Sequence, residues 1–238
     1  MSEPATFSLE PLTDQCASIC ARKEHVVLGV SPGNSYFRVA LLTDLLRWLS
    51  DNFARVDVVV PDAALIHTFT ALGYAPERAA GKVRAEINVL RNRVVRAWAA
   101  SGGPRGGDGV HLMSELTDRV AYRNALARCE AAVRTDPELR RACRTASREV
   151  LLSRRPAREP VDEEVETGLR YLLAELPFFV ASADIFDVPS SLTFYHRPFP
   201  LANLIFSRRT RLAVSERQAY ALVRPVDLSP LPLRTTTR

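Results

Sequence analysis

The stretch HVVLGVSPGNSYF, residues 25–37, decides the fold. Its apolar, β-branched first half is typical of a central parallel strand, and the Pro-Gly pair that follows stops this strand abruptly. Apolar residues at helical spacing come next, over 39–49, and a second β-branched run at 56–60 predicts another strand. Strand, loop, helix and strand make a βαβ unit, and such crossovers build parallel sheets. Ligands bind just beyond the carboxyl ends of strands in open sheets of this kind, and Ser31 lies at such an end.

The composition is that of an ordinary globular protein. Hydrophobic residues make up 47% of the 238 residues, which is enough for a sizeable core. No apolar run approaches the roughly 20 residues of a membrane span, and the first residues lack the basic start and apolar segment of a secretory signal. The four cysteines show neither CxxC pairing nor a nearby His at zinc spacing. We therefore expect reduced thiols in a cytoplasmic protein that has no metal site.

The patterns along the chain predict one α/β domain at 25–224. A loosely attached N-terminal arm is expected at 1–24, and a disordered tail, rich in Pro and Thr, at 225–238. Beyond the βαβ unit the expected elements are a helix at 76–98, a strand at 110–113, helices at 117–134, 136–154 and 162–176, a strand at 192–195, a short helix at 200–206 and a strand at 219–223. Pro177 is expected to end the helix that precedes it and to begin an irregular segment.

The long helix predicted at 76–98 carries an excess of positive charge. The net charge of the chain is only +5, so the position of the charge matters more than its total. An apolar stripe marks the buried face of this helix. Six cations lie on its other faces: Arg78, Lys82, Arg84, Arg91, Arg93 and Arg96. Only Glu77 and Glu86 oppose them. Most charged helices are simply solvated, but this balance also suits a polyanion such as a nucleic acid, and the charge pattern by itself leaves both interpretations open.

The segment Gly29-Val30-Ser31-Pro32-Gly33 fits the GxSxG pattern of the nucleophile elbow in α/β-hydrolases. That fold needs several strands before the elbow and a His late in the chain. Here the segment follows the first predicted strand, and His196 belongs to a strand-like segment. A serine hydrolase is one alternative, and a Ser that only caps the following helix is another. Backbone N–H groups at such a strand-to-loop turn can face an oxyanion.

Taken together, the motifs resemble those of the cyclodipeptide synthases over most of the chain, from about His25 to Val223. The matching blocks, in order, are GVSPGNSYF at 29–37, VDVVVPD at 56–62, HTFTALGY at 67–74, SEL at 114–116, YLLAE at 171–175 and VPSSLTFYH at 188–196. The resemblance implies a single Rossmann-like α/β domain, with a central, mostly parallel sheet flanked by helices, similar to the catalytic domain of class I aminoacyl-tRNA synthetases. It implies no ATP and no other cofactor, and the chain lacks a P-loop and the HIGH and KMSKS signatures of true synthetases.

The resemblance also implies roles for individual residues. Ser31 matches the nucleophile that carries the aminoacyl group, and Tyr195 matches a hydroxyl that relays protons. Glu175 matches the carboxylate that holds the substrate ammonium, assisted by Tyr171. Asn34, Tyr122 and His196 match positions that orient the aminoacyl group. The expected pocket for the first side chain is apolar with one hydroxyl: Val27, Gly29, Val59, Pro61, Met113, Phe178 and Thr193.

The implied reaction joins two aminoacyl groups, taken from aminoacyl-tRNAs, into a 2,5-diketopiperazine by a ping-pong mechanism through aminoacyl-Ser31 and dipeptidyl-Ser31. An apolar or aromatic first residue is expected from the uncharged pocket. Asn34 and Tyr195 place the chain in the Asn-Tyr-Gln-like branch, although His196 stands where Gln is frequent. The basic helix then grips tRNA, and we expect a monomer that binds neither membrane nor DNA. The alternatives are the serine hydrolase and a non-catalytic tRNA-binding relative, which would need none of the four residues Ser31, Tyr171, Glu175 and Tyr195.

Overall fold

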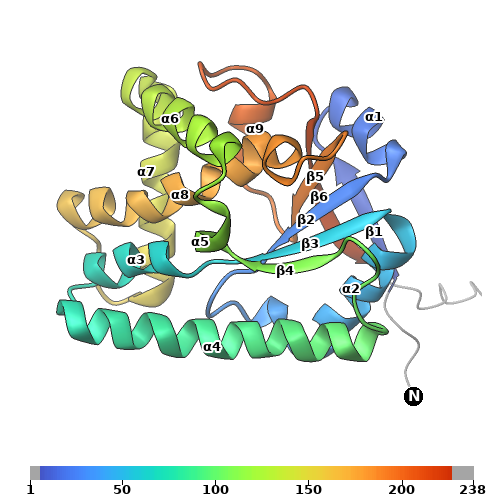
Figure 1. The fold of residues 1–238 in the computed structure, drawn as a ribbon. Coiled ribbons are helices and arrows are strands. Elements are labelled where there is room, and N and C mark those ends of the chain that lie inside the picture. The colour runs from blue at the N-terminus through green and yellow to red at the C-terminus, as the bar shows by residue number, and fades with distance from the viewer. Residues whose placement is uncertain (1–5, 227–238) are drawn as a thin grey trace, which may run out of the picture.

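A six-stranded sheet forms the centre of the molecule, whose computed structural model describes residues 6–226 (Figure 1). The strands lie in the order β1-β6-β5-β2-β3-β4, and every neighbouring pair is parallel except β1 and β6. Their bounds are β1 (Thr6–Pro11), β2 (His25–Gly29), β3 (Arg55–Val60), β4 (Gly109–Leu112), β5 (Ser191–Tyr195) and β6 (Gln218–Val226). The predicted α/β class with a mostly parallel central sheet is confirmed.

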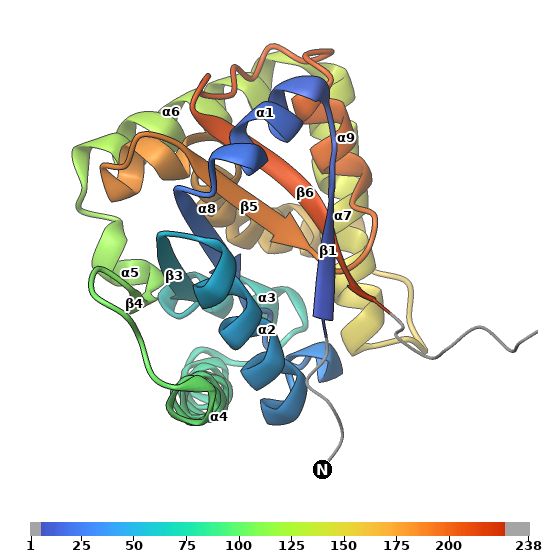
Figure 2. The same ribbon diagram turned by 90° about the vertical axis from the view of Figure 1, so that its right-hand side faces the viewer.

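Helices cover both faces of this sheet, with α2 and α4 on one side and α6 and α8 on the other (Figures 1 and 2). The helices are α1 (Asp14–Arg22), α2 (Val39–Asn52), α3 (Ile66–Ala71), α4 (Pro76–Ser101), α5 (Met113–Leu116), α6 (Val120–Thr135), α7 (Pro137–Arg154), α8 (Asp162–Phe186) and α9 (Pro200–Phe206), with 3-10 turns η1 (Ser35–Phe37) and η2 (Ala63–Leu65). The leucines of α2 that the sequence spaced three and four apart, Leu42, Leu45, Leu46 and Leu49, are buried in one core with Val26 and Leu28 of β2. Burial of this apolar stripe is the main force that fixes the crossover.

The predicted βαβ unit is present as β2, α2 and β3. Positions 26–28 of β2 are almost fully buried, and β2 pairs in parallel with β3 so that Gly29 lies opposite Val59. The chain turns after Ser31, whose carbonyl accepts from the N–H of Asn34 at 3.3 Å. Gly33 has φ +74°, a left-handed conformation that favours glycine. The Asn34 side chain then accepts from the N–H of Tyr36 at 2.9 Å and caps η1.

The expected loose attachment of the N-terminal arm is wrong for residues 6–22. β1 pairs antiparallel with β6 at the edge of the sheet, and α1 follows it (Figure 2). Phe7, Cys16 and Ile19 are buried in the main core, so this polar-looking segment contributes apolar side chains at the spacing of its strand and helix. Thr13 accepts from the N–H of Cys16 at 3.2 Å and caps α1. Residues 1–5 lie outside the described part of the chain.

The prediction that a helix ends at Pro177 is also wrong, because α8 continues to Phe186. Pro177 has no N–H to donate, but it is buried together with the residues after it, and this burial outweighs the lost hydrogen bond. The backbone leaves helical geometry only at Ala181, with φ −150° and ψ 25°, which marks the kink. The segment 177–186 is therefore core helix, and not the irregular stretch that the sequence suggested.

The remaining elements lie close to their predicted positions. The long basic helix α4 runs from Pro76 to Ser101 and ends at Gly102, whose φ of 110° is left-handed. Pro225 and Val226 belong to β6, and the rest of the predicted tail, 227–238, lies outside the described residues. Among the helices of 6–226, none combines the length and the apolar character needed to cross a membrane.

Candidate active site

Ser31 lies where the sequence placed it, in the loop at the carboxyl end of β2, and it is half-buried. Asn34, three residues on, donates through Nδ2 to the hydroxyl of Tyr195 at 3.4 Å, so the loop is tied to the end of β5. A Cβ placed on Gly29 would meet no atom within 4 Å, so the strand leaves open space directly before the loop. The end of β2 therefore presents a hydroxyl beside room for a ligand, with a tyrosine and an amide at its edge.

No histidine of the described chain forms a hydrogen bond with the Ser31 hydroxyl. His25 and His111 both bond to Asp57. The ring of His196 stacks on Tyr36 at 4.0 Å between centroids. Within residues 6–226, Ser31 therefore lacks the histidine partner that usually activates a hydrolase serine.

Tyr171 and Glu175 form a close pair on one face of α8. The Tyr171 hydroxyl donates to Oε1 of Glu175 at 2.5 Å, as their spacing of four residues predicts. Burial raises the pKa of Glu175 to about 7, and the bond from Tyr171 opposes this rise. Burial also raises the pKa of Tyr171 well above its ordinary value, with a further increase from the charge of Glu175. The site therefore holds a carboxyl group that ionises near neutral pH and can pair with a cation.

Most of the expected pocket residues share one apolar cluster. Val27 and Val59, on neighbouring strands, lie in it with Met113 and Phe178. Tyr122 joins the same cluster, where its ring is 5.5 Å from that of Phe178. The Tyr122 hydroxyl donates to the carbonyl oxygen of Ala174 at 3.0 Å, and Ala174 directly precedes Glu175. The cluster can hold an apolar side chain close to that carboxylate.

The other predicted pocket residues lie at its edges. Gly29 is opposite Val59 in the sheet, and Thr193 of β5 is opposite Val27. The Thr193 hydroxyl donates to the carbonyl oxygen of Ala219 at 3.3 Å. Pro61, directly after β3, is buried but is not part of the apolar cluster.

His196 lies between the rings of Tyr36 and Tyr195. Its ring centroid lies 4.3 Å from that of Tyr195, in addition to the stack on Tyr36. Burial, together with a smaller effect of the neighbouring charge of Arg197, lowers the pKa of His196 to about 4. The ring is therefore neutral near pH 7, and its stacking restricts the orientation of Tyr195.

The six cations of the basic helix lie outside the stripe of α4 that is buried. Val83, Leu90 and Val94 of its stripe are buried, as predicted. Arg78 and Lys82 lie over the ring of Tyr74, at 5.3 and 5.7 Å from its centroid. Arg84, Arg91 and Arg96 are exposed, and Arg93 is half-buried. Within residues 6–226, no carboxylate lies within ion-pair distance of any of the six: the described ion pairs all involve other residues.

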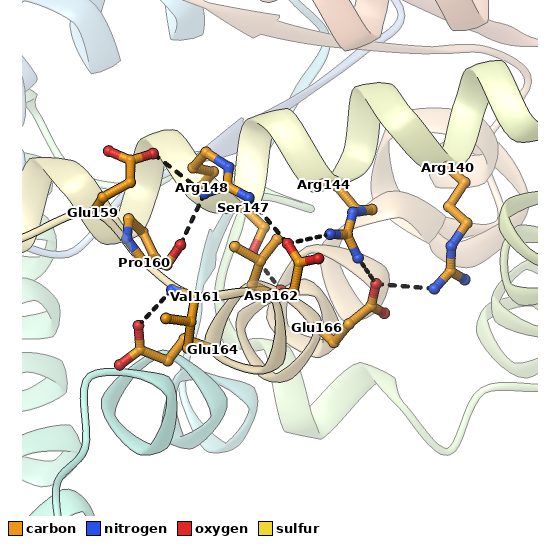
Figure 3. A network of polar contacts seen from close by, with 11 residues as sticks. Arg140, Arg144, Ser147, Arg148, Glu159, Pro160, Val161, Asp162, Glu164 and Glu166 are labelled. Carbon is orange, nitrogen blue, oxygen red and sulfur yellow. Dashed lines mark hydrogen bonds and ion pairs between the residues drawn. The ribbon is translucent and has the colours of Figure 1, made fainter.

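Four of the five arginines of α7 differ from those of α4 because carboxylates already pair with them. Figure 3 shows Arg140 and Arg144 on Glu166, and Arg144 and Arg148 on Asp162. These contacts fasten α7 to the start of α8. The two Arg-rich helices therefore differ in charge pairing: most arginines of α7 are paired within the fold, whereas the six cations of α4 have no carboxylate partner among residues 6–226.

A buried polar network that the sequence did not reveal lies against Phe186 of the apolar cluster, whose ring contacts those of His25 and His111. Asp57 of β3 accepts from His25 at 3.0 Å and from His111 at 2.7 Å, and it pairs with Arg55 at 2.6 Å. His25 also contacts the hydroxyl of Ser191 at 2.9 Å. Burial by itself would raise the pKa of Asp57, but the two histidine bonds hold it below its ordinary value. The signal in the sequence was an acidic residue inside a strand of valines, which needs buried partners.

The sheet order, the crossover after β2 and the serine at the carboxyl end of that strand define an α/β protein of the Rossmann type. A cyclodipeptide synthase family model matches residues 7–225. The cyclo(L-leucyl-L-phenylalanyl) synthase of Streptomyces noursei is 34% identical, over 92% of each chain. The cyclo(L-tyrosyl-L-tyrosyl) synthase of Mycobacterium tuberculosis is also 34% identical, over 94% of this chain and 78% of its own.

A solved structure of a Mycobacterium tuberculosis protein, described as demonstrating that cyclodipeptide synthetases are related to type I tRNA synthetases, superimposes with a TM-score of 0.80. The two sequences are 32% identical, and the match covers 95% of this chain and 99% of the chain in the solved structure. The chain therefore belongs to the cyclodipeptide synthase family. Members of this family are aminoacyltransferases that use aminoacyl-tRNAs, and the chain is such an enzyme.

Proposed function

We propose that the enzyme makes a 2,5-diketopiperazine by ping-pong catalysis on Ser31. Two features of this family member together support the proposal. A serine hydroxyl lies at a strand end without a histidine base, and the site contains a carboxyl group with a pKa of about 7. An aminoacyl-tRNA ester is already activated, so it needs a well-placed nucleophile and an ammonium site more than a strong base.

In the first step, the Ser31 oxygen bonds to the ester carbon of an aminoacyl-tRNA, the bond from this carbon to the tRNA oxygen breaks, and that oxygen takes up the serine proton. In the second step, the neutral amine of aminoacyl-Ser31 bonds to the ester carbon of a second aminoacyl-tRNA, the bond from this carbon to the second tRNA oxygen breaks, and that oxygen takes up the proton that the amine loses. The dipeptidyl group then remains on Ser31. Its free amine finally attacks the Ser31 ester, and the serine oxygen leaves and recovers a proton.

The other site residues have distinct roles in this scheme. Glu175, held by Tyr171, pairs with the substrate ammonium and accepts its proton before the amine attacks. Tyr195, which Asn34 contacts at 3.4 Å, relays a proton in the closing step. Tyr122 and His196 position the aminoacyl group. The Asn34–Tyr195 contact also supports membership of the Asn-Tyr-Gln-like branch, with His196 in the place of Gln.

The aminoacyl pocket favours an apolar or aromatic first residue, because its cluster of Val27, Val59, Met113 and Phe178 presents no charge. The two relatives, a cyclo(L-leucyl-L-phenylalanyl) synthase and a cyclo(L-tyrosyl-L-tyrosyl) synthase, agree with this choice. We further propose a monomeric cytoplasmic enzyme whose single domain includes β1 and α1 in addition to 25–224. Expression in a bacterium, followed by mass spectrometry of the medium, tests the activity and identifies the product. A serine hydrolase would instead react with a fluorophosphonate without any need for tRNA.

The width of the pocket gives a first prediction. Val59 faces the open space beside Gly29, and Val59→Leu adds one methylene there. The ratio of diketopiperazines with bulky residues to those with small ones is expected to fall by about 10-fold or more, the usual effect of a methylene in such a pocket. Product ratios from mixed aminoacyl-tRNAs measure this. The matched control is Val58→Leu, whose side chain points to the opposite face of β3 and which changes stability but not the ratio. Equal ratios in Val59→Leu and the wild type would contradict the pocket assignment.

The unpaired cations of α4 give a second prediction. The double variant Arg93→Ala and Arg96→Ala is expected to raise the KM for aminoacyl-tRNA. It is also expected to flatten the plot of log kcat/KM against log salt concentration by about 0.9 for each phosphate that the variant no longer neutralises. The control is Arg140→Ala on α7, where a carboxylate already neutralises the cation at 2.9 Å, and its salt dependence stays that of the wild type. Unchanged kinetics of the double variant across salt concentrations would show that these cations are only solvated.

A further inference from the structure

Arg154, the last residue of α7, joins the loop that carries Ser31 to the basic helix α4. Its guanidinium forms a bidentate ion pair with Glu86 of α4: Nη1 donates to Oε1 at 2.9 Å and Nη2 to Oε2 at 3.0 Å. The same Nη2 donates to the carbonyl oxygen of Pro32 at 3.3 Å, one residue after Ser31. Only 18% of the Arg154 side chain is exposed. Such a planar, multidentate donor fixes geometry in a way that a single flexible contact does not.

The surroundings of Arg154 hold it in this position. Its guanidinium lies over the ring of Phe69 in α3, 5.3 Å from the centroid. A Cβ placed on Gly33 would lie 3.8 Å from Nη2, so the guanidinium lies against two successive residues of the loop. Phe69 shares an apolar cluster with Tyr171, the partner of Glu175. Arg154 thus touches α3, α4 and the loop at once, next to the tyrosine of the ammonium site.

Apart from the turn bond from the N–H of Asn34 to the carbonyl of Ser31 and the Asn34 cap of η1, few contacts of the described residues fix the path of the loop. The N–H of Val30 donates to Val59 at 3.3 Å, and the Asn34 side chain reaches Tyr195 at 3.4 Å, both long hydrogen bonds. Among the described side chains, Arg154 is the one that donates to the loop backbone between these two contacts, at the Pro32 carbonyl oxygen. A displacement of about 1 Å in a reacting group can cost about 100-fold in rate, so a contact to the residue directly after Ser31 can affect catalysis.

We propose that Arg154 is a positioning residue for acyl transfer: Glu86 and Phe69 fix its guanidinium, and the guanidinium fixes the Pro32 carbonyl and thereby Ser31. This inference rests on the proposed role of Ser31 as nucleophile. Arg154 acts through the loop and needs no contact with the substrate. Its loss is therefore expected to slow formation of aminoacyl-Ser31 without weakening the binding of tRNA.

The first test compares Arg154→Met with Arg144→Met, using aminoacyl-tRNA at saturating concentration and rapid quenching. Met keeps much of the apolar stem and removes the charge and the donors. Arg144 is a matched control because it lies on the same helix, is 27% exposed and binds two carboxylates of the α8 start, away from the loop (Figure 3). The acylation rate constant is expected to fall by at least about tenfold in Arg154→Met, with KM within about twofold, and to stay near wild type in Arg144→Met.

A double variant tests whether Glu86 works through Arg154. Glu86→Gln is expected to slow acylation less than Arg154→Met does. The double variant is expected to be no slower than Arg154→Met alone, because both changes break the same ion pair. Arg154→Lys keeps the charge and the fold but not the bidentate pair. Its acylation rate constant is expected to lie between those of the wild type and Arg154→Met. Additive losses, or an acylation rate in Arg154→Met equal to that of the wild type, would overturn the inference.

Amide hydrogen exchange provides a readout that does not depend on activity. Exchange at residues 30–34 is expected to be faster in Arg154→Met than in both Arg144→Met and the wild type. Failure of the wild type to form any adduct would refute the proposed function, and the exchange result would still decide whether Arg154 orders the loop. Equal exchange in all three proteins would overturn the positioning role.

Discussion

Replacing Ser31 by Ala is expected to abolish diketopiperazine formation, with a loss of at least about 10³-fold. The first and last steps of the proposed cycle form and break a bond to the Ser31 oxygen, and the second step acts on the aminoacyl group that this oxygen carries. The change is small, at a half-buried loop position, so the protein is expected to fold and to keep its affinity for tRNA. Product is measured by mass spectrometry after incubation with two charged tRNAs, and tRNA affinity by filter binding.

The matched control for Ser31→Ala is Ser50→Ala on α2. The Ser50 hydroxyl is buried and has no hydrogen-bond partner among the described residues, so its removal is expected to leave the activity unchanged. A Ser31→Ala enzyme with near-normal product formation would show that the aminoacyl group is carried elsewhere or not at all.

Glu175→Gln is the second change with a large expected effect. The amide keeps the shape of the side chain but cannot neutralise a substrate ammonium, and the loss of one partner from a buried ion pair costs about 3–5 kcal/mol. The expected fall in kcat/KM is therefore about 100-fold or more. Tyr171→Phe removes only the 2.5 Å bond to this carboxylate and is expected to cost less. A Glu175→Gln enzyme within about tenfold of the wild type would remove Glu175 from the ammonium site.

The pH dependence follows from the pKa of Glu175, which burial raises to about 7. The ionised form binds the ammonium, so kcat/KM of the wild type is expected to rise with pH through about 7, and this rise is expected to be missing in Glu175→Gln. The free energy of unfolding changes with pH in the opposite direction to kcat/KM. The folded chain holds this proton more tightly than the unfolded chain does, so ionisation costs stability as the pH rises from about 4.5 through about 7. Above that range, Glu175→Gln is expected to melt at a higher temperature than the wild type.

The sequence predicted those features that depend on local pattern. The strand, loop and helix around Ser31 follow from a β-branched run, a Pro-Gly stop and leucines at helical spacing, and the structure has them as β2, the loop and α2. The spacing of four between Tyr171 and Glu175 likewise predicted their contact on α8. The stripe of α4 predicted which of its faces is buried.

The features that the sequence could not show depend on partners far along the chain. β1 is a strand because it pairs with β6, more than two hundred residues later, and its own alternation is weak. The helix past Pro177 persists because its apolar residues are buried on several sides, a tertiary effect that overrides the local signal of proline. Arg154 gave no sign of its position, since its three neighbours Pro32, Phe69 and Glu86 come from separate segments.

The most direct test of the whole account is the intact mass of the enzyme after its turnover with a single aminoacyl-tRNA has been quenched in acid. We predict a mass increase equal to one aminoacyl residue, which peptide mapping assigns to Ser31 and which disappears in Ser31→Ala. An unmodified enzyme during active turnover, or an adduct on another residue, would contradict the account.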